Sequence, residues 1–211
     1  MNSNPTWNVA NNSRKTYTSW AETMIPASEV AKTINQWRNE AVVVTASKAM
    51  RQWSMVSGQR ELDVNLHDCP DRVAAVGLGI SLARPDLKVI IFDNDAALRI
   101  NPSTMATVGS LEPQNLVHII LEDVTHQSTD GIPIPGLDGL DFVELAKIYG
   151  YRQAHRFDQI EELALSIEDI LLSEGPALIV VRVYYEATLA RPPDSTTSES
   201  FNRVKSELLV R

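Results

Sequence analysis

The sequence predicts an α/β fold with a doubly wound, mainly parallel sheet and helices on both of its faces. Apolar, strand-like runs alternate with helical patterns along most of the chain, and the strand runs are apolar at successive positions. Strands of that kind are covered on both faces, and strict alternation of strands and helices requires crossovers between parallel strands. A chain of 211 residues is also long enough to bury a core of its own.

The expected elements follow one another in a regular order. The first helix is expected to begin at Ser28, as its N-cap, because Val30, Ile34 and Trp37 share one helical face. Strands are expected at 41–46, 62–66, 88–92, 115–121, 152–157 and 177–183. Further helices are expected at 71–83, 103–111, 140–150, 158–172 and 201–211. Most of these helices lie between two strands, as crossover connections do.

The helix expected at 158–172 has a clear amphipathic pattern. Asp158 and Glu161 have the spacing of a capping box. An inward stripe at helical spacing comprises Ile160, Leu163, Ile167 and Ile170. This helix is therefore expected to pack one face against the sheet.

The chain is expected to divide into three parts. Residues 1–26 mix Asn, Ser, Thr and Pro without periodicity, which indicates an N-terminal extension or an arm that contacts a partner. Residues 27–190 are expected to form the α/β domain, and residues 191–211 a linker followed by a closing helix.

Charge and composition exclude several classes of protein. The net charge of −8 comes without any block of Lys or Arg, which disfavours a nucleic-acid surface. The apolar runs are far shorter than the roughly 20 residues of a membrane span, and the polar N-terminus does not resemble a signal peptide, so a soluble, cytoplasmic protein is expected. The single cysteine, Cys69, allows neither an intramolecular disulfide nor a zinc framework.

Acidic residues follow two of the expected strands, where parallel sheets bind their ligands. Asp93, Asn94 and Asp95 come after the strand at 88–92, and Asp123 comes after the strand at 115–121, 28 residues beyond Asp95. Two carboxylates at one sheet edge suit Mg²⁺ that is held together with a phosphate. The alternative interpretation is that these acids belong to turns and helix caps.

Three stretches carry a resemblance to a known family. They are TASKAMRQW at 45–53, the long register from GLGISLARPDLKVIIFDNDAAL to HQSTDGIPIPG at 77–136, and DFVELAKIYGY at 141–151. Residues 42–182 resemble the thiamine-diphosphate-binding half of phosphonopyruvate decarboxylase, with sulfopyruvate decarboxylase β subunits and the acetolactate synthase group as more distant relatives. The resemblance implies a thiamine-diphosphate-binding fold and a site for thiamine diphosphate and Mg²⁺.

The resemblance also implies which residues hold the cofactor. Where the family has a Gly-Asp-Gly motif, this chain has Asn94, Asp95 and Ala96. Asp95 is the implied first metal ligand, Asp123 stands in place of an asparagine ligand, and the carbonyl of Thr125 is the implied third ligand. Asn tolerates the left-handed backbone and is expected to keep the turn. The remaining implied cofactor contacts are Asn94, Ala96, Ala97, Cys69 and Ser128.

The segment at 68–71 departs from the family pattern. The Gly-Ser-Met-Gly of the family, which packs near the cofactor, is Asp68, Cys69, Pro70 and Asp71 here. Two additional carboxylates are thereby expected near an anion. Two unscreened like charges about 4 Å apart repel each other by roughly 4 kcal/mol at an effective dielectric of 20. Lys48, Arg72 and Arg99 are expected to compensate; otherwise the site is degenerate. Cys69 has a packing role as its alternative.

Histidines and a loop complete the candidate site. His126 matches a family histidine and is the expected catalytic, substrate-facing residue, with a solvated loop imidazole as the alternative. Ser128 belongs to a loop that closes on the cofactor in the related enzymes, and a plain surface loop is its alternative. His118, inside an apolar run, is expected to be a buried or edge-strand residue, and His67 has a capping or packing role or faces substrate.

The resemblance covers only the diphosphate-binding half of the family's active site. The family's pyrimidine-binding domain, which activates the cofactor, has no counterpart in 211 residues. The sequence therefore predicts a subunit of a thiamine-diphosphate- and Mg²⁺-dependent decarboxylase of a small 2-oxo acid, in a hetero-oligomer or homo-oligomer with a pyrimidine-domain partner. The alternative is a non-catalytic relative that serves as a structural or regulatory partner of an active subunit.

Overall fold

A seven-stranded sheet forms the centre of the molecule. The computed structural model describes residues 24–123, 140–185, 193 and 195–210. The strand order is β1-β7-β5-β4-β2-β3, β6 also pairs with β7, and every pairing is parallel. The strands are β1 (Ile25–Pro26), β2 (Val42–Ala46), β3 (Asp63–Leu66), β4 (Val89–Asn94), β5 (Leu116–Asp123), β6 (Gln153–Phe157) and β7 (Ala177–Tyr184). The predicted α/β class with a parallel sheet is confirmed.

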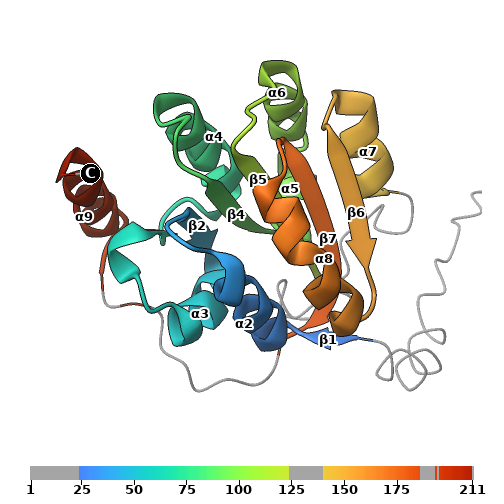
Figure 1. Ribbon diagram of the computed structural model, residues 1–211, viewed down its shortest axis with the longest axis horizontal. Helices are drawn as coiled ribbons and strands as arrows, with labels where there is room; N and C mark the ends of the chain where they lie inside the picture. Colours follow the sequence, from blue (N-terminus) through green and yellow to red (C-terminus); the bar gives the residue numbers. More distant parts are fainter. Residues whose placement is uncertain (1–23, 124–139, 186–192, 194, 211) are drawn as a thin grey trace, which may run out of the picture.

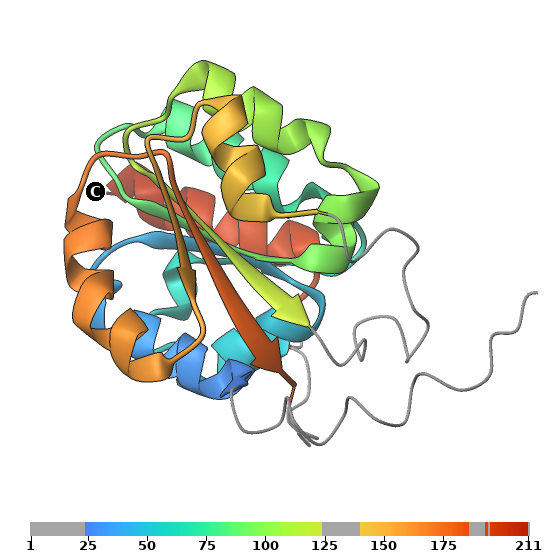
Figure 2. The same ribbon diagram turned by 90° about the vertical axis from the view of Figure 1, so that its right-hand side faces the viewer.

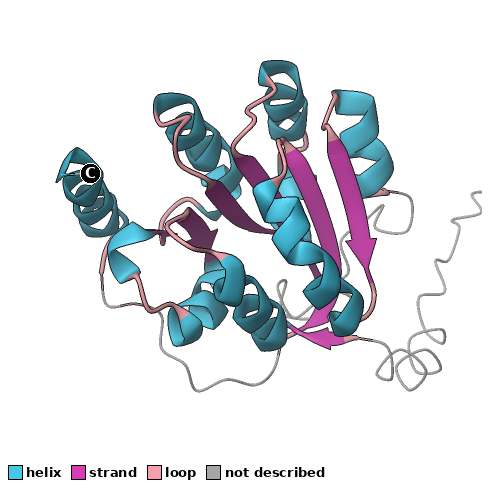
Figure 3. Ribbon diagram, in the orientation of Figure 1, coloured by secondary structure: helices cyan, strands magenta, loops and turns pink. Residues whose placement is uncertain are grey.

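Helices cover both faces of this sheet (Figure 1, Figure 2). The helices are α2 (Ala27–Trp37), α3 (Ser47–Val56), α4 (Val73–Ala83), α5 (Asp95–Ile100), α6 (Ser103–Leu111), α7 (Phe142–Tyr149), α8 (Ile160–Leu172) and α9 (Thr197–Val210), with short 3₁₀ turns η1 (Arg60–Leu62) and η2 (Pro70–Arg72). One buried core lies between the sheet and α2, α3 and α8, and a second lies between the sheet and α4 to α7 together with α9. The molecule is therefore a three-layer sandwich (Figure 3).

The predicted strands and the helices between them are observed. β4 and β5 are buried at every position, as their uninterrupted apolar runs indicate. In α8, Leu163, Ile167 and Ile170 are buried and Ile160 packs against the same core. The predicted inward stripe is confirmed, and it packs against the face of the sheet that α2 also covers.

The two predicted helix caps are wrong. Helix α2 begins at Ala27, two residues earlier than a Ser28 cap allows, because Ile25 and Pro26 pair with β7 and lead straight into the helix. Ser28 lies inside the helix and is buried. Helix α8 begins at Ile160 after Gln159, and no side chain caps it, so Asp158 and Glu161 do not form a capping box. Residue spacing alone does not determine which residue is the cap.

Both ends of the described chain contribute to the fold. β1 lies within the predicted N-terminal arm, at the edge of the sheet beside β7. Helix α9 begins at Thr197, four residues before the predicted 201, and Ser200 exchanges hydrogen bonds with the backbone of Asn65 in β3. The edge strand β3 is thereby covered by α9, which protects it from pairing with another chain.

A buried ion pair fixes the amino end of β3. Arg38, after α2, donates to Oδ1 of Asp63 at 2.9 Å, and Trp53 of α3 donates to the same oxygen at 2.9 Å. Ser57 donates to Oδ2 of Asp63 at 2.5 Å. Burial lowers the pKa of Arg38, while its contact with Asp63 opposes that shift. This cluster ties α2, α3 and β3 together at the end of the sheet opposite to the acids of the candidate site.

The described helices lack the character of a membrane span. None of them combines sufficient length with sufficient apolar character to cross a bilayer.

Candidate functional site

The sheet brings Asp95 and Asp123 together at its carboxyl edge. β4 and β5 are neighbours, with Asn94 opposite Leu121, and each strand runs directly into one of the two acids. The backbone N–H of Asp123 donates to Oδ1 of Asp95 across 3.4 Å, and both residues are 1% exposed. The two predicted acidic ligands are thus adjacent, although they are 28 residues apart in the sequence.

The turn before Asp95 is held by side chains. Asn94 has extended backbone, with φ −118° and ψ 152°, so the expected left-handed turn is not formed. Its Oδ1 instead accepts from the N–H of Ala97 at 2.8 Å and caps α5. Oδ1 of Asp93 accepts from the N–H of Asn94 at 2.8 Å. Asn94 therefore replaces the glycine by capping the helix, and the N–H of Ala97 is already engaged.

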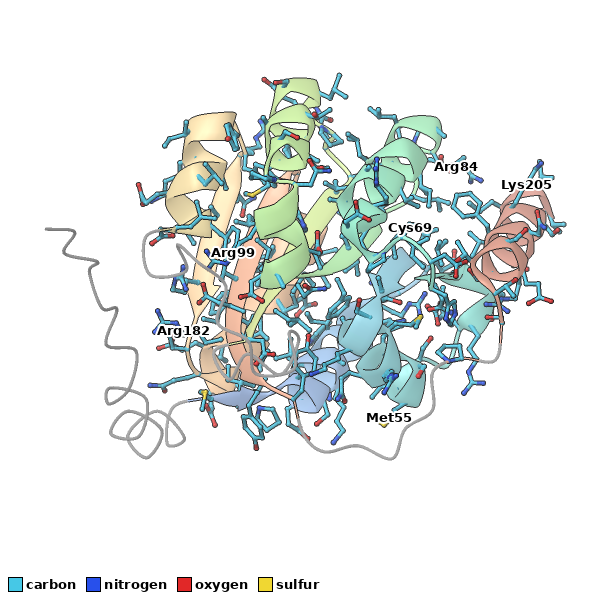
Figure 4. All side chains as sticks on the ribbon, turned by 180° about the vertical axis from the view of Figure 1, so that it is seen from behind. Met55, Cys69, Arg84, Arg99, Arg182 and Lys205 are labelled. Carbon is cyan, nitrogen blue, oxygen red and sulfur yellow. The ribbon has the colours of Figure 1, made fainter. Side chains whose placement is uncertain are left out.

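The surroundings of Asp95 stabilise its ionised form only in part. Its pKa is raised to about 6: burial is the largest cause, the hydrogen bond from Asp123 and the charge of Arg99 oppose the rise, and the charges of Asp123 and Glu122 add to it. Nε of Arg99 lies 3.8 Å from Oδ2 of Asp95, and the guanidinium lies over the ring of Phe142. Arg99, which was expected to compensate the acids at 68–71, pairs with Asp95 instead; it is labelled in Figure 4.

A second acid of this edge is neutralised independently. Glu122 forms ion pairs with Arg156 at 2.8 Å and with Arg182 at 3.2 Å. Arg182, labelled in Figure 4, belongs to the neighbouring strand β7. The charge of Glu122 is therefore balanced by two arginines.

The two carboxylates of the segment at 68–71 have partners of their own. Asp68 is exposed and accepts from the hydroxyl of Thr197 at 3.5 Å, and Asp71 pairs with Arg72 at 3.1 Å. Cys69 packs against the core on the α4 side, at the foot of α4 (Figure 4). Arg72 thus compensates Asp71, and the packing alternative describes Cys69 in this structure.

Two buried features of the site were not predicted from the sequence. The first is a chain in which His118 contacts the hydroxyl of Tyr151 at 3.0 Å and Asp93 at 3.4 Å. His118 is fully buried, as predicted, and through Asp93 it supports the turn at Asn94. The second is Tyr185, which follows β7 and is 3% exposed. Its only signal in the sequence is an aromatic residue directly after the last apolar run.

Three predicted site residues cannot be placed. Thr125, His126 and Ser128 lie outside the described residues. His67 is half-buried, and its backbone N–H donates to Thr197 rather than to a residue of the acidic pair. The described part of the candidate site therefore consists of Asp95, Asp123 and the groups around them.

The donor set fits a cation that is shared with a diphosphate. Mg²⁺ requires only one or two carboxylates from a protein and fills its other positions with phosphate oxygens and water. Asp95 and Asp123 supply those two carboxylates. Among the described residues no cluster of three or more His, Cys, Asp or Glu side chains could hold a metal ion. At this edge the described side chains would therefore share the cation with other ligands. The buried hydroxyl of Tyr185 and Nε of Arg99 have no hydrogen-bond partner in the described part of the chain.

A cavity at the opposite end of the sheet is unrelated to these groups. It has a volume of about 560 Å³, and its lining includes Arg38, Lys88 and Leu172 but neither Asp95 nor Asp123. Arg38 is occupied by Asp63, and Lys88 donates to the carbonyl of Ser173 at 2.8 Å. The chemistry is therefore better sought at the acidic edge than in this cavity.

The stability of the metal-free protein is expected to fall as the pH rises through about 6, and Asp95 is the reason. Its pKa is about 6 in the folded protein and about 3.8 unfolded, so the folded state binds the proton more tightly. The tighter proton binding by the folded state stabilises it fully below pH 3.8, and this stabilisation is lost as the pH rises through about 6. Each unit of difference between the folded and the unfolded pKa corresponds to about 1.4 kcal/mol of unfolding free energy. Urea unfolding of the wild type and Asp95→Asn in EDTA, from pH 4 to 7, measures it. Identical pH dependence in both proteins would show that Asp95 is not the responsible group.

Comparison with known families connects this edge to a cofactor. A family profile described as the C-terminal TPP-binding domain of thiamine pyrophosphate enzymes matches residues 43–181. Phosphonopyruvate decarboxylase of Streptomyces viridochromogenes is 30% identical over 142 residues, covering 67% of this chain and 35% of the relative. The sulfopyruvate decarboxylase subunit beta of Methanocaldococcus jannaschii is 25% identical over 109 residues, covering 52% of this chain and 57% of the relative.

Solved structures agree on the fold. A thiamine diphosphate-dependent 4-hydroxybenzoylformate decarboxylase of Rhodococcus jostii superposes with a TM-score of 0.59 at 18% identity, covering 79% of this chain and 34% of the other. The chain spans about a third of the length of the phosphonopyruvate decarboxylases that it matches. The parallel sheet, the two adjacent acids and the match over residues 43–181 together show that the chain belongs to the thiamine pyrophosphate enzyme family, through the C-terminal domain that binds thiamine pyrophosphate.

Proposed function

We propose that this chain is the diphosphate-binding subunit of a thiamine-diphosphate- and Mg²⁺-dependent decarboxylase of a small 2-oxo acid. The single observation that carries the proposal is the hydrogen bond from the backbone N–H of Asp123 to the carboxylate of Asp95, which brings two buried acidic residues together at the carboxyl edge of the sheet. Similarity to phosphonopyruvate and sulfopyruvate decarboxylases favours a 2-oxo acid with an anionic tail as the substrate.

The residues of this chain bind and orient the cofactor. When bound, thiamine diphosphate supplies the nucleophile and the electron sink for loss of carbon dioxide. Asp95 and Asp123 hold the cation that screens the diphosphate, and Thr125 is the proposed third ligand. Asn94 caps α5 and fixes the position of Asp95, while Ala96 is small enough to allow close approach. His126 and Ser128 remain the proposed substrate-facing histidine and loop contact.

A partner is part of this proposal. The similarity to a sulfopyruvate decarboxylase subunit beta supports a two-chain enzyme, in which a pyrimidine-binding domain comes from another subunit. The chain would then work in a hetero-oligomer, or in a homo-oligomer if a longer chain carries both domains. Nothing in its charge favours a nucleic-acid partner.

A non-catalytic role is the second candidate, and a specific observation favours it. Residues 68–71, which the family uses as Gly-Ser-Met-Gly, lead into the 3₁₀ turn η2, with Asp68 hydrogen-bonded to Thr197 at the start of α9 and Cys69 packed against the core. In this alternative the chain keeps the sheet and its contacts and regulates or scaffolds an active subunit.

Calorimetric titration separates the two candidates. The purified protein is titrated with thiamine diphosphate in the presence of Mg²⁺, alone and after mixing with the pyrimidine-domain subunit. Saturable heat that disappears when EDTA replaces Mg²⁺ is expected from the decarboxylase subunit. Absence of heat in both settings would contradict cofactor binding and leave the structural or regulatory role.

A further inference from the structure

Tyr185 lies at the same edge of the sheet as the acidic pair. β7 pairs with β5 so that Val183 is opposite Asp123, and Tyr185 follows two residues later on the same face of the strand. Its ring belongs to the core on the α2 side, and the ammonium of Lys48, in the first turn of α3, lies 5.5 Å from the ring centroid. The side chain is thus wedged between the end of β7 and the start of α3.

The hydroxyl of Tyr185 is buried without a hydrogen-bond partner in the described part of the chain. A buried tyrosine hydroxyl normally has a partner, because leaving it unpaired sacrifices the hydrogen bonds that water would make to it. Burial raises the pKa of this phenol, and the negative charges of Asp123, Asp95 and Asp93 add to the rise. A tyrosine hydroxyl can donate a hydrogen bond to an ionised carboxylate, so this buried hydroxyl can serve as a donor to one of these acids.

The aspartate at position 123 provides a reason for such a hydrogen-bond donor. The family supplies the second metal ligand from the neutral amide of an asparagine, whereas this chain supplies a carboxylate. The carboxylate of Asp123 therefore adds a negative charge next to Asp95 that an asparagine would not add, and a neighbouring donor can fix the orientation of this carboxylate toward a cation. A hydrogen bond from a neutral donor stabilises a carboxylate without competing with the bound cation.

We infer that Tyr185 is a positioning residue for Asp123: its hydroxyl donates to the Asp123 carboxylate in the loaded site and orients it toward the cation. This inference rests on the proposed function. It concerns only how this chain accommodates an aspartate where its family uses an asparagine. It predicts that Tyr185 and Asp123 are energetically coupled in Mg²⁺ binding.

A double-mutant cycle tests the coupling. Mg²⁺ is titrated calorimetrically into wild type, Tyr185→Phe, Asp123→Asn and the double variant, each saturated with thiamine diphosphate. Tyr185→Phe is expected to weaken Mg²⁺ binding about tenfold in the wild-type background and less than about twofold in the Asp123→Asn background. Tyr184→Phe, the neighbour on the opposite face of β7, is the matched control and is expected to bind as wild type.

The outcomes separate this inference from the proposed function. A Tyr185→Phe protein that binds Mg²⁺ as well as wild type, or that loses the same factor in both backgrounds, overturns the positioning role while cofactor binding stands. A wild-type protein that binds no Mg²⁺ with thiamine diphosphate overturns both. Thermal unfolding without metal is expected at the same or a higher temperature in Tyr185→Phe, because phenylalanine removes a buried hydroxyl that has no partner in the described part of the chain; a large destabilisation would indicate a purely structural residue.

A spectroscopic signal gives an independent check. With tyrosine labelled at the ring carbon that bears the hydroxyl, the Tyr185 resonance is assigned by its absence in Tyr185→Phe. It is expected to shift when Mg²⁺ and thiamine diphosphate are added to wild type, and to shift less in Asp123→Asn. An unmoved resonance on saturation contradicts the hydrogen bond.

Discussion

Asp95→Asn is expected to weaken Mg²⁺-dependent binding of thiamine diphosphate by at least roughly a hundredfold. The variant removes one of two adjacent carboxylates from a buried site, and the remaining Asp123 provides half of the charge. The fold should persist, because the amide oxygen of asparagine can still accept the hydrogen bond from the N–H of Asp123. Calorimetric titration with the cofactor at fixed Mg²⁺ measures the loss.

The matched control is an aspartate at the opposite end of the sheet. Asp86 is exposed and pairs with Arg84 at 2.7 Å, so Asp86→Asn makes the same chemical change away from the site. This control is expected to bind the cofactor as wild type. Equal affinity of the Asp95→Asn and Asp86→Asn proteins would remove Asp95 from the site.

Asp63→Ala is expected to lower the free energy of unfolding by about 3–5 kcal/mol, the usual cost of breaking a buried ion pair from one side. The change leaves Arg38 with a buried, unpaired charge and deprives Trp53 and Ser57 of their acceptor. Because the cluster ties α2, α3 and β3 together, the loss should appear as one cooperative transition at lower urea concentration.

An exposed ion pair provides the reference for this prediction. Asp71 pairs with Arg72 near the surface, and Asp71→Ala is expected to change stability by less than about 1 kcal/mol. If Asp63→Ala were no more destabilising than Asp71→Ala, the buried cluster would not be the element that fixes the edge of the sheet.

The sheet was predictable because its signal is local. Runs such as those of β4 and β5 are apolar at successive positions, and a strand buried on both faces requires this. The turn at Asn94 was less accessible, because asparagine can either adopt a left-handed backbone or cap a helix, and only the fold selects the cap. Helix α5 follows from that choice and was not predicted.

The pairing of Asp95 with Asp123 was predictable because both follow strands of one parallel sheet, and the resemblance supplied the roles. The residues that contact those two acids were not predictable from the sequence. Arg99 lies one helical turn beyond Asp95, but Tyr185 comes from a strand 62 residues after Asp123, and no spacing rule connects them. The Arg38–Asp63 pair is equally hidden, since it depends on how α2 and β3 meet in space.

The most direct test is a crystal structure with thiamine diphosphate and Mn²⁺ in place of Mg²⁺, with anomalous scattering used to locate the metal. We expect one strong anomalous peak within coordination distance of the carboxylates of both Asp95 and Asp123, with diphosphate density against it. A crystal grown with the cofactor and Mn²⁺ that shows no peak there, or shows the metal at another edge of the sheet, would contradict it.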